Sequence, residues 1–142
     1  MTANVFFDTN IAVYAYDDTE PVKQSIARQL LKDAASRQVG VISVQVLGEF
    51  FHATVVRRKL LTCDLAVVAL RALGSLKVVG IDAALVDDAI AFHRRFQLRY
   101  WDALILATAR RAGARTVISE DLSDGHDYDG VGVHNPFLVK AN

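Results

Sequence analysis

Short apolar runs alternate along this chain with longer stretches in which apolar residues recur at helical spacing. Runs of two to four apolar residues bounded by polar residues or glycine are typical of buried strands, whereas the longer stretches predict helices that bury one face. The expected strands cover residues 5–7, 41–42, 77–79, 115–118 and 131–133. The expected helices cover residues 11–16, 20–37, 44–57, 62–74, 83–96 and 100–112.

Several predicted helix ends carry their own signals. Thr19, Ser43, Thr62 and Asp82 each stand just before a helical stretch, where a side-chain oxygen can accept a hydrogen bond from the first turn. Gly113 follows the last helical stretch, as is common at a helix C-terminus. These boundaries agree with the periodicity, so the order of elements is well defined by the sequence.

The alternation of strands and helices predicts an α/β fold in which a parallel sheet of four to five short strands is covered by helices on both faces. No repeat or linker interrupts the pattern, so one domain over residues 1–142 is expected. Because crossover connections between parallel strands are right-handed, the carboxyl ends of the strands meet at one edge of the sheet. Binding sites form at that edge in open parallel sheets.

The composition narrows the class of protein further. With a single cysteine, Cys63, the chain can form neither a disulfide framework nor a four-cysteine zinc site, and it fits a reducing cytoplasm. No signal-type segment or membrane-length apolar run is present in the sequence, so a cytoplasmic protein without a membrane role is expected. The formal net charge is zero, so a nucleic acid would have to be bound through local clusters of charge.

Three carboxylates stand among apolar neighbours. Asp8 closes the first strand, and Glu49 and Asp102 lie in helical stretches that are otherwise apolar for several residues on either side. Asp121 follows the strand that ends at residue 118, with Glu120 beside it. Each acid stands at a strand end or early in a helix, so all four are expected at the same edge of the sheet.

Four carboxylates at one edge repel one another, by about 4 kcal/mol for a pair at ~4 Å with an effective dielectric constant of ~20. Either some are protonated or cations lie among them. Oxygen ligands without histidine or cysteine suit Mg²⁺ or Mn²⁺. Each acid also has a purely structural explanation. The alternatives are a helix cap for Asp8, an ion pair with His52 for Glu49, an ion pair with Arg99 for Asp102 and a turn for Asp121.

Four pieces of the sequence, taken in order, resemble the PIN-domain ribonucleases, and in particular the VapC-type toxins of bacterial and archaeal toxin–antitoxin pairs. The pieces are Phe7-Asp8-Thr9-Asn10 and residues 43–50, 100–105 and 119–122. They span nearly the whole chain in the order found in the family. The resemblance implies a PIN-like three-layer fold with a central parallel sheet.

The resemblance also implies roles for particular residues. Asp8, Glu49 and Asp102 match the family's metal ligands, which are also its catalytic residues. The family pattern of Ser or Thr, one variable residue and then Asp selects Asp121 as the fourth acid, with Glu120 as the fallback. Asn10 and Ser119 match positions that support the ligands through hydrogen bonds.

The function expected from this resemblance is a Mg²⁺- or Mn²⁺-dependent endoribonuclease that hydrolyses RNA phosphodiester bonds with a metal-activated water. It would be the toxin of a type II toxin–antitoxin pair, bound by a cognate antitoxin and forming a homodimer. The alternatives are a catalytically silent or housekeeping PIN module that binds or processes RNA. A metal-dependent phosphatase ranks last, because Asn10 stands where its motif has a second Asp.

Two further sets of residues are candidates for partner contacts. Basic clusters flank two of the acidic helices, and RNA phosphates are one possible partner for them beside ordinary solvation. Four apolar side chains near the Glu49 helix belong either to the core or to a groove for an amphipathic antitoxin helix. The basic clusters are residues 57–59 and Arg94, Arg95 and Arg99, and the apolar residues are Phe50, Phe51, Leu60 and Leu61.

Overall fold

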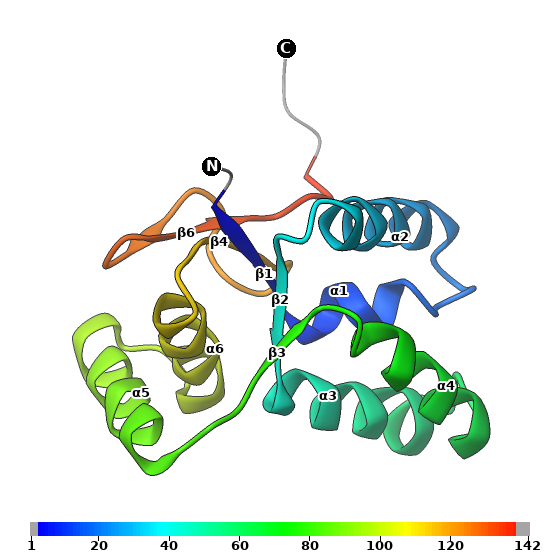
Figure 1. Ribbon diagram of the computed structural model, residues 1–142, viewed down its shortest axis with the longest axis horizontal. Helices are drawn as coiled ribbons and strands as arrows, with labels where there is room; N and C mark the ends of the chain where they lie inside the picture. Colours follow the sequence, from blue (N-terminus) through cyan, green and yellow to red (C-terminus); the bar gives the residue numbers. More distant parts are fainter. Residues whose placement is uncertain (1–2, 139–142) are drawn as a thin grey trace.

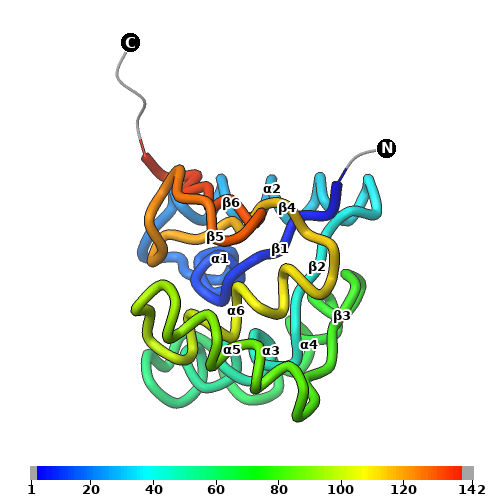
Figure 2. The backbone as a smooth tube through the Cα atoms, turned by 90° about the vertical axis from the view of Figure 1, so that its left-hand side faces the viewer, coloured from blue at the N-terminus to red at the C-terminus, as the bar shows by residue number. Residues whose placement is uncertain are grey.

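A six-stranded sheet runs through the middle of the protein. In the computed structural model, which describes residues 3–138, the strand order is β3-β2-β1-β4-β6-β5. All neighbouring pairs are parallel except β5 and β6, which are antiparallel. Figure 2 shows β6, β4, β1 and β2 side by side. The strands are β1 (Asn4–Phe7), β2 (Gly40–Ser43), β3 (Lys77–Val79), β4 (Ala114–Ile118), β5 (Asp127–Tyr128) and β6 (Val131–His134).

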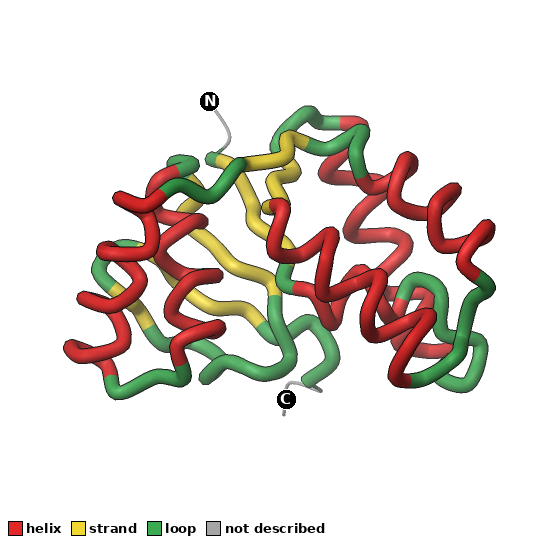
Figure 3. The backbone as a smooth tube through the Cα atoms, turned by 90° about the horizontal axis from the view of Figure 1, so that it is seen from below, coloured by secondary structure: helices red, strands yellow, loops and turns green. Residues whose placement is uncertain are grey.

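Helices lie on both sides of this sheet, as expected for an α/β fold. Figure 1 shows α5 and α6 on one side and α1 to α4 on the other, and Figure 3 shows the strands between these two groups. Within residues 3–138 there is no helix with the length and apolar character of a membrane span. The helices are α1 (Thr9–Tyr14), α2 (Pro21–Ser36), α3 (Val44–Phe51), η1 (His52–Arg57), α4 (Cys63–Leu73), α5 (Ala83–Phe96) and α6 (Tyr100–Arg111).

Most predicted helix starts are confirmed by their capping bonds. The side chains of Ser43, Thr62 and Asp82 each accept a hydrogen bond from a backbone N–H in the first turn. The prediction for Thr19 is wrong. Its hydroxyl donates instead to Asp17 at 2.6 Å, and α2 begins after Glu20 without a side-chain cap.

The core is centred on β1, β2, β4 and α6. Phe6 and Phe7 of β1 are fully buried, and every residue of α6 from 103 to 109 is buried. Of the four apolar residues near Glu49, Phe50 belongs to the core, because its side chain is completely buried. Phe51, Leu60 and Leu61 are only half-buried, and Leu60 and Leu61 pack against the core.

Two local features were not predicted. The chain between Ser119 and Val131, expected to be a polar turn, contains the short antiparallel strand β5, which joins β6 through a tight turn with Asp129 and Gly130 at positive φ. The helix that carries Glu49 also changes at His52 into a π-helical segment, η1. π-helical turns are frequent at functional sites, and this one ends at Arg57.

Candidate active site

The four acids approach the same region from four different elements. Asp8 directly follows the central strand β1, and Asp121 follows its neighbour β4. Glu49 lies in α3, and Asp102 lies in the first turn of α6. The negative charges of Asp121 and Glu49 act on Asp8, and that of Asp102 acts on Glu49. The fold therefore places Asp8 near Asp121 and Glu49, and Glu49 near Asp102.

Asp8 is the most deeply placed of the four, with 6% of its surface exposed. One carboxylate oxygen accepts a hydrogen bond of 2.7 Å from the backbone N–H of Thr9, so the side chain also caps α1. The other accepts one of 2.7 Å from the Ser119 hydroxyl. Burial, with a smaller contribution from the charges of Asp121 and Glu49, nevertheless raises the pKa of Asp8 to about 6.

Asn10 and Ser119 connect Asp8 to Asp121. The Asn10 amide donates to a carboxylate oxygen of Asp121 at 3.0 Å, and its carbonyl oxygen accepts from the backbone N–H of Glu120 at 3.2 Å. The Ser119 hydroxyl oxygen accepts from the backbone N–H of Asp121 at 3.1 Å. These bonds hold the loop after β4 against the start of α1, so both residues lie where the sequence expected supporting groups.

Glu120 and Asp121 have separate environments. Both oxygens of the Glu120 carboxylate are engaged away from the other acids, because Tyr14 donates to one at 2.7 Å and the Lys23 ammonium lies 2.7 Å from the other. The bond to Lys23 holds the pKa of Glu120 below its ordinary value despite partial burial. Asp121 is exposed, and both residues line a cavity with Glu49. Only the Glu120 carboxylate is taken up by Tyr14 and Lys23.

Glu49 and Asp102 differ in how their charge is compensated. Partial burial and the nearby charge of Asp102 raise the pKa of Glu49, and His52 is not among the groups that shift it. Asp102 has the predicted partner, because the Arg99 Nε and Nη2 atoms lie 3.2 and 3.5 Å from its two carboxylate oxygens. The ion pair that offers a purely structural explanation is thus present for Asp102, and none with His52 is found for Glu49 among the described residues.

An open cavity of about 280 Å³ lies over this region. Glu49 and Asp121 line it together with Arg57, Arg58 and Arg99, so members of both basic clusters reach the same cavity. Its other lining residues are Thr9, Asn10, Val13, Tyr14, Ala53 and Glu120.

The cavity arginines differ in how they are held. Arg58 is also committed to the buried carboxylate of Asp17, at 2.6 Å. Arg95 belongs to another surface, where it pairs with Asp129 at 3.6 Å. Of the two predicted basic clusters, Arg57, Arg58 and Arg99 therefore line the cavity, and Arg95 does not.

The donor atoms fit a hard divalent cation in chemical type, because they are carboxylate oxygens with no histidine or cysteine among them. Two further oxygens next to this region, Thr9 Oγ1 and Gln45 Oε1, are buried without a hydrogen-bond partner. Within residues 3–138, however, no three His, Cys, Asp or Glu side chains are already close enough together to hold a metal ion. A bound cation therefore requires side-chain movement, first of all at Asp102, which is paired with Arg99.

Comparison with known proteins shows the family to which this chain belongs. The family model described as PIN domain matches residues 5–123, so this chain belongs to the PIN-domain family. No curated protein sequence matches it significantly. The family assignment confirms the resemblance read from the sequence, and the fold agrees with it.

Solved structures with the same fold include VapC proteins and their complexes. A toxin–antitoxin complex from Klebsiella pneumoniae has a chain 21% identical, with a TM-score of 0.67 over 96% of this chain and 100% of that one. A chain of DNA-bound VapBC from Salmonella typhimurium is 13% identical, with a TM-score of 0.70 over 95% and 99%. VapC20 of Mycobacterium tuberculosis, a toxin that cleaves the sarcin–ricin loop, is 22% identical, with a TM-score of 0.65 over 83% and 90%.

Proposed function

We propose that this protein is a Mg²⁺- or Mn²⁺-dependent endoribonuclease and the VapC-type toxin of a type II toxin–antitoxin pair in the cytoplasm. The observation that carries the proposal is the shared cavity, where carboxylates and arginines meet at the strand ends of a PIN fold. Carboxylates bind cations, and arginines bind phosphates, so the cavity has a group for each part of a metal-dependent attack on RNA.

In this proposal Asp8, Glu49, Asp102 and Asp121 hold the metal and are the catalytic residues. When bound, a divalent ion would activate water as a nucleophile and stabilise negative charge on the phosphate. The Ser119 hydroxyl and the Asn10 amide fix the carboxylates of Asp8 and Asp121 through the bonds described above.

Arg57 is the proposed contact for an RNA phosphate. It lies at the end of η1 and lines the cavity with Glu49, while Arg58 beside it is tied to Asp17. Phosphate contacts carry most of the affinity for nucleic acid and little of the sequence preference. Arg57→Gln should therefore weaken RNA binding for all sequences alike, whereas Arg94→Gln, outside the cavity lining, should leave it unchanged.

The catalytic proposal is tested with a fluorescent RNA pool and purified protein. The unmodified protein should cleave the pool with Mg²⁺ or Mn²⁺ and stop in EDTA, and Asp102→Asn should lose at least about a hundredfold in rate, as is usual when an electrostatic catalytic group is removed. Metal-independent cleavage, or parental rates in Asp102→Asn, would refute the metal-dependent nuclease. A protein that binds RNA without cutting it would support the silent PIN module, which the separated acids favour.

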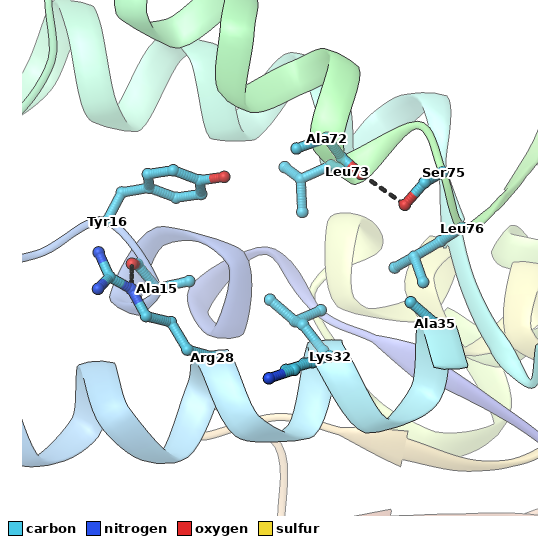
Figure 4. A pocket seen from close by; sticks show the side chains of 10 residues that line it. Ala15, Tyr16, Arg28, Lys32, Ala35, Ala72, Leu73, Ser75 and Leu76 are labelled. Carbon is cyan, nitrogen blue, oxygen red and sulfur yellow. Dashed lines mark hydrogen bonds between the residues drawn. The ribbon is translucent and has the colours of Figure 1, made fainter. Parts of the chain in front are cut away.

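The antitoxin is proposed to bind at an apolar cavity beside the C-terminal end of α1. This cavity, about 400 Å³ in volume, opens between α2 and α4, as Figure 4 shows. Leu73 and Leu76 supply much of its apolar wall, and Arg28 and Lys32 stand at its rim. A partner segment with an apolar side chain for the cavity and acidic residues for the rim would complement this surface.

A co-expression experiment tests this partner. Induction of the protein alone should arrest growth, and the small open reading frame immediately upstream should relieve the arrest. Ala35→Trp, which fills the cavity with a bulky ring, should prevent relief without preventing arrest. Ala84→Trp, an exposed position on α5, is the matched control and should behave like the unmodified protein. Absence of arrest in a host that contains the target RNA would favour a housekeeping RNA-processing nuclease.

We also propose a homodimer, because closed two-fold pairs are the commonest soluble assembly. Exposed apolar residues on α4, Leu65 and Val68, are 57% and 63% accessible and offer a surface for it. Sedimentation of the unmodified protein and of Val68→Asp would test the proposal. A monomer in both samples would refute it.

A further inference from the structure

Arg99 has an unusual place at the start of α6. It is the N-cap residue, yet its side chain makes no capping bond. A positive charge at a helix N-terminus is unfavourable, because the helix dipole is positive at that end. Among the described residues, the only contribution of this side chain to α6 is its i,i+3 ion pair with Asp102, so its contacts lie with the acidic residues.

The guanidinium engages both carboxylate oxygens of Asp102, at 3.2 and 3.5 Å. It also lines the cavity next to Glu49 and Asp121. Arg99 thus neutralises Asp102 by direct contact and shares the cavity with two further acids, Glu49 and Asp121. A positive charge among these carboxylates is what a bound cation would also supply.

We propose that Arg99 is a positioning residue that occupies the place of the cation while the protein is metal-free, and that it must release Asp102 before a divalent ion can bind. This inference rests on the proposed function, since it assigns Asp102 to the metal. Competition between Arg99 and the ion for the same oxygens would lower the metal affinity of the site. It would also keep the acidic residues neutralised until an ion arrives.

The two partners differ in their freedom to move. The Arg99 side chain is 79% exposed and can turn into water, whereas the Asp102 side chain is 20% exposed and belongs to a helix whose following residues are all buried. The arginine is therefore the partner that leaves. An exposed ion pair contributes little, so its loss should raise metal affinity by only about 1.4- to 5-fold.

The test is calorimetric titration of Mn²⁺ into protein freed of metal with EDTA and then dialysed. Arg99→Gln should bind Mn²⁺ about 1.4- to 5-fold more tightly than the unmodified protein. Arg99→Lys, which keeps the charge, should stay close to the unmodified affinity. Arg95→Gln, which removes an arginine paired with Asp129 on another surface, is the matched control and should not change the affinity.

A second measurement separates competition from a general structural effect. In EDTA, Arg99→Gln should melt at a lower temperature than the unmodified protein, because the carboxylates lose their counter-ion, and saturating Mn²⁺ should remove this difference. Equal or weaker Mn²⁺ binding by Arg99→Gln, with clear binding by the unmodified protein, would overturn the inference alone. Absence of saturable Mn²⁺ binding by either protein would overturn the proposed metal site together with it.

Discussion

Ser119 donates a hydrogen bond of 2.7 Å to Asp8 across 111 positions of sequence. The bond exists because β1 and β4 are parallel neighbours, with Phe7 paired to Ile118, so the residues that follow the two strands emerge side by side. The same Ser119 oxygen accepts from the backbone N–H groups of Asp121 and Leu122. One buried hydroxyl therefore orients the deepest carboxylate and the loop that carries Asp121.

Ser119→Ala should destabilise the protein by about 1–3 kcal/mol, because it leaves the Asp8 carboxylate and buried backbone donors without their partner. Urea denaturation followed by circular dichroism measures this loss. Ser75→Ala, which removes an exposed hydroxyl bonded to its own helix end, should change the free energy of unfolding by less than about 0.5 kcal/mol. Equal effects of the two substitutions would contradict the role given to Ser119.

The stability of the metal-free protein should fall as the pH rises from about 4 to 6. The pKa of Asp8 is raised from 3.8 to about 6 in the folded protein, so folding favours the protonated form, and ionisation of Asp8 destabilises the fold. At ~1.36 kcal/mol per unit, the full effect is about 3 kcal/mol above pH 6 and vanishes below pH 4.

Asp8→Asn tests this pH dependence directly. The variant should be more stable than the unmodified protein by about 1–3 kcal/mol at pH 7 in EDTA, and the difference should shrink toward pH 4. The lower bound allows for the amide, which replaces an acceptor facing Ser119 with a donor. Asp87→Asn, on the exposed face of α5, is the control. A gain that does not depend on pH would show that the ionisation of Asp8 is not its source.

Substitution of Asp121 and of Glu120, compared side by side, tests which of the two is the fourth acid of the site. Asp121→Asn should reduce metal-dependent cleavage strongly, by about a hundredfold, with little loss of stability, because this side chain is exposed at the cavity. Glu120→Gln should keep most of the activity and lose up to about 1 kcal/mol of stability with its ion pair to Lys23. Rates measured on the same RNA would decide between them, and the reverse ranking would assign the role to Glu120.

Arg58→Gln should destabilise the protein by about 1–3 kcal/mol at pH 7, because it leaves the Asp17 carboxylate, which is 0% exposed, without its cation. Burial alone would raise the pKa of Asp17, but the bonds from Thr19 and Arg58 hold it below its ordinary value. The stabilisation is therefore present at neutral pH and lost as the pH falls through this lowered pKa. Chemical denaturation at pH 7 and pH 3, with Lys59→Gln as control, measures both effects.

Much of the fold follows from local signals in the sequence. The parallel strands and all the long helices are predicted by apolar spacing, and Ser43, Thr62 and Asp82 mark helix starts correctly. Strand β5 was missed because two residues are too few for a periodic pattern, although the Asp129-Gly130 pair is a hairpin signal. The extent of the domain over residues 1–142 stays a prediction.

The candidate site was predictable as a set of acids, but its internal contacts were not. An acid among apolar residues is visible in one sequence, as Asp8 and Glu49 show. The bonds of Glu120 to Tyr14 and Lys23 join side chains 106 and 97 positions apart, and no local pattern reports such pairs. The choice between core and groove for Phe50 was left open for the same reason, because only the packing of α3 against the rest of the chain decides which of its faces is buried.

The position of β1 at the centre of the sheet also determines when the site can form. Its two partners follow it at different distances along the chain, since β2 begins at Gly40 and β4 ends only at Ile118. Contacts between such distant segments make folding slow, because a long loop must close before they form. On a ribosome, the carboxylate of Asp8 would remain without Ser119 and Asp121 until most of the protein had been synthesised. A nascent chain therefore carries Asp8 long before it carries the other acids of the candidate site.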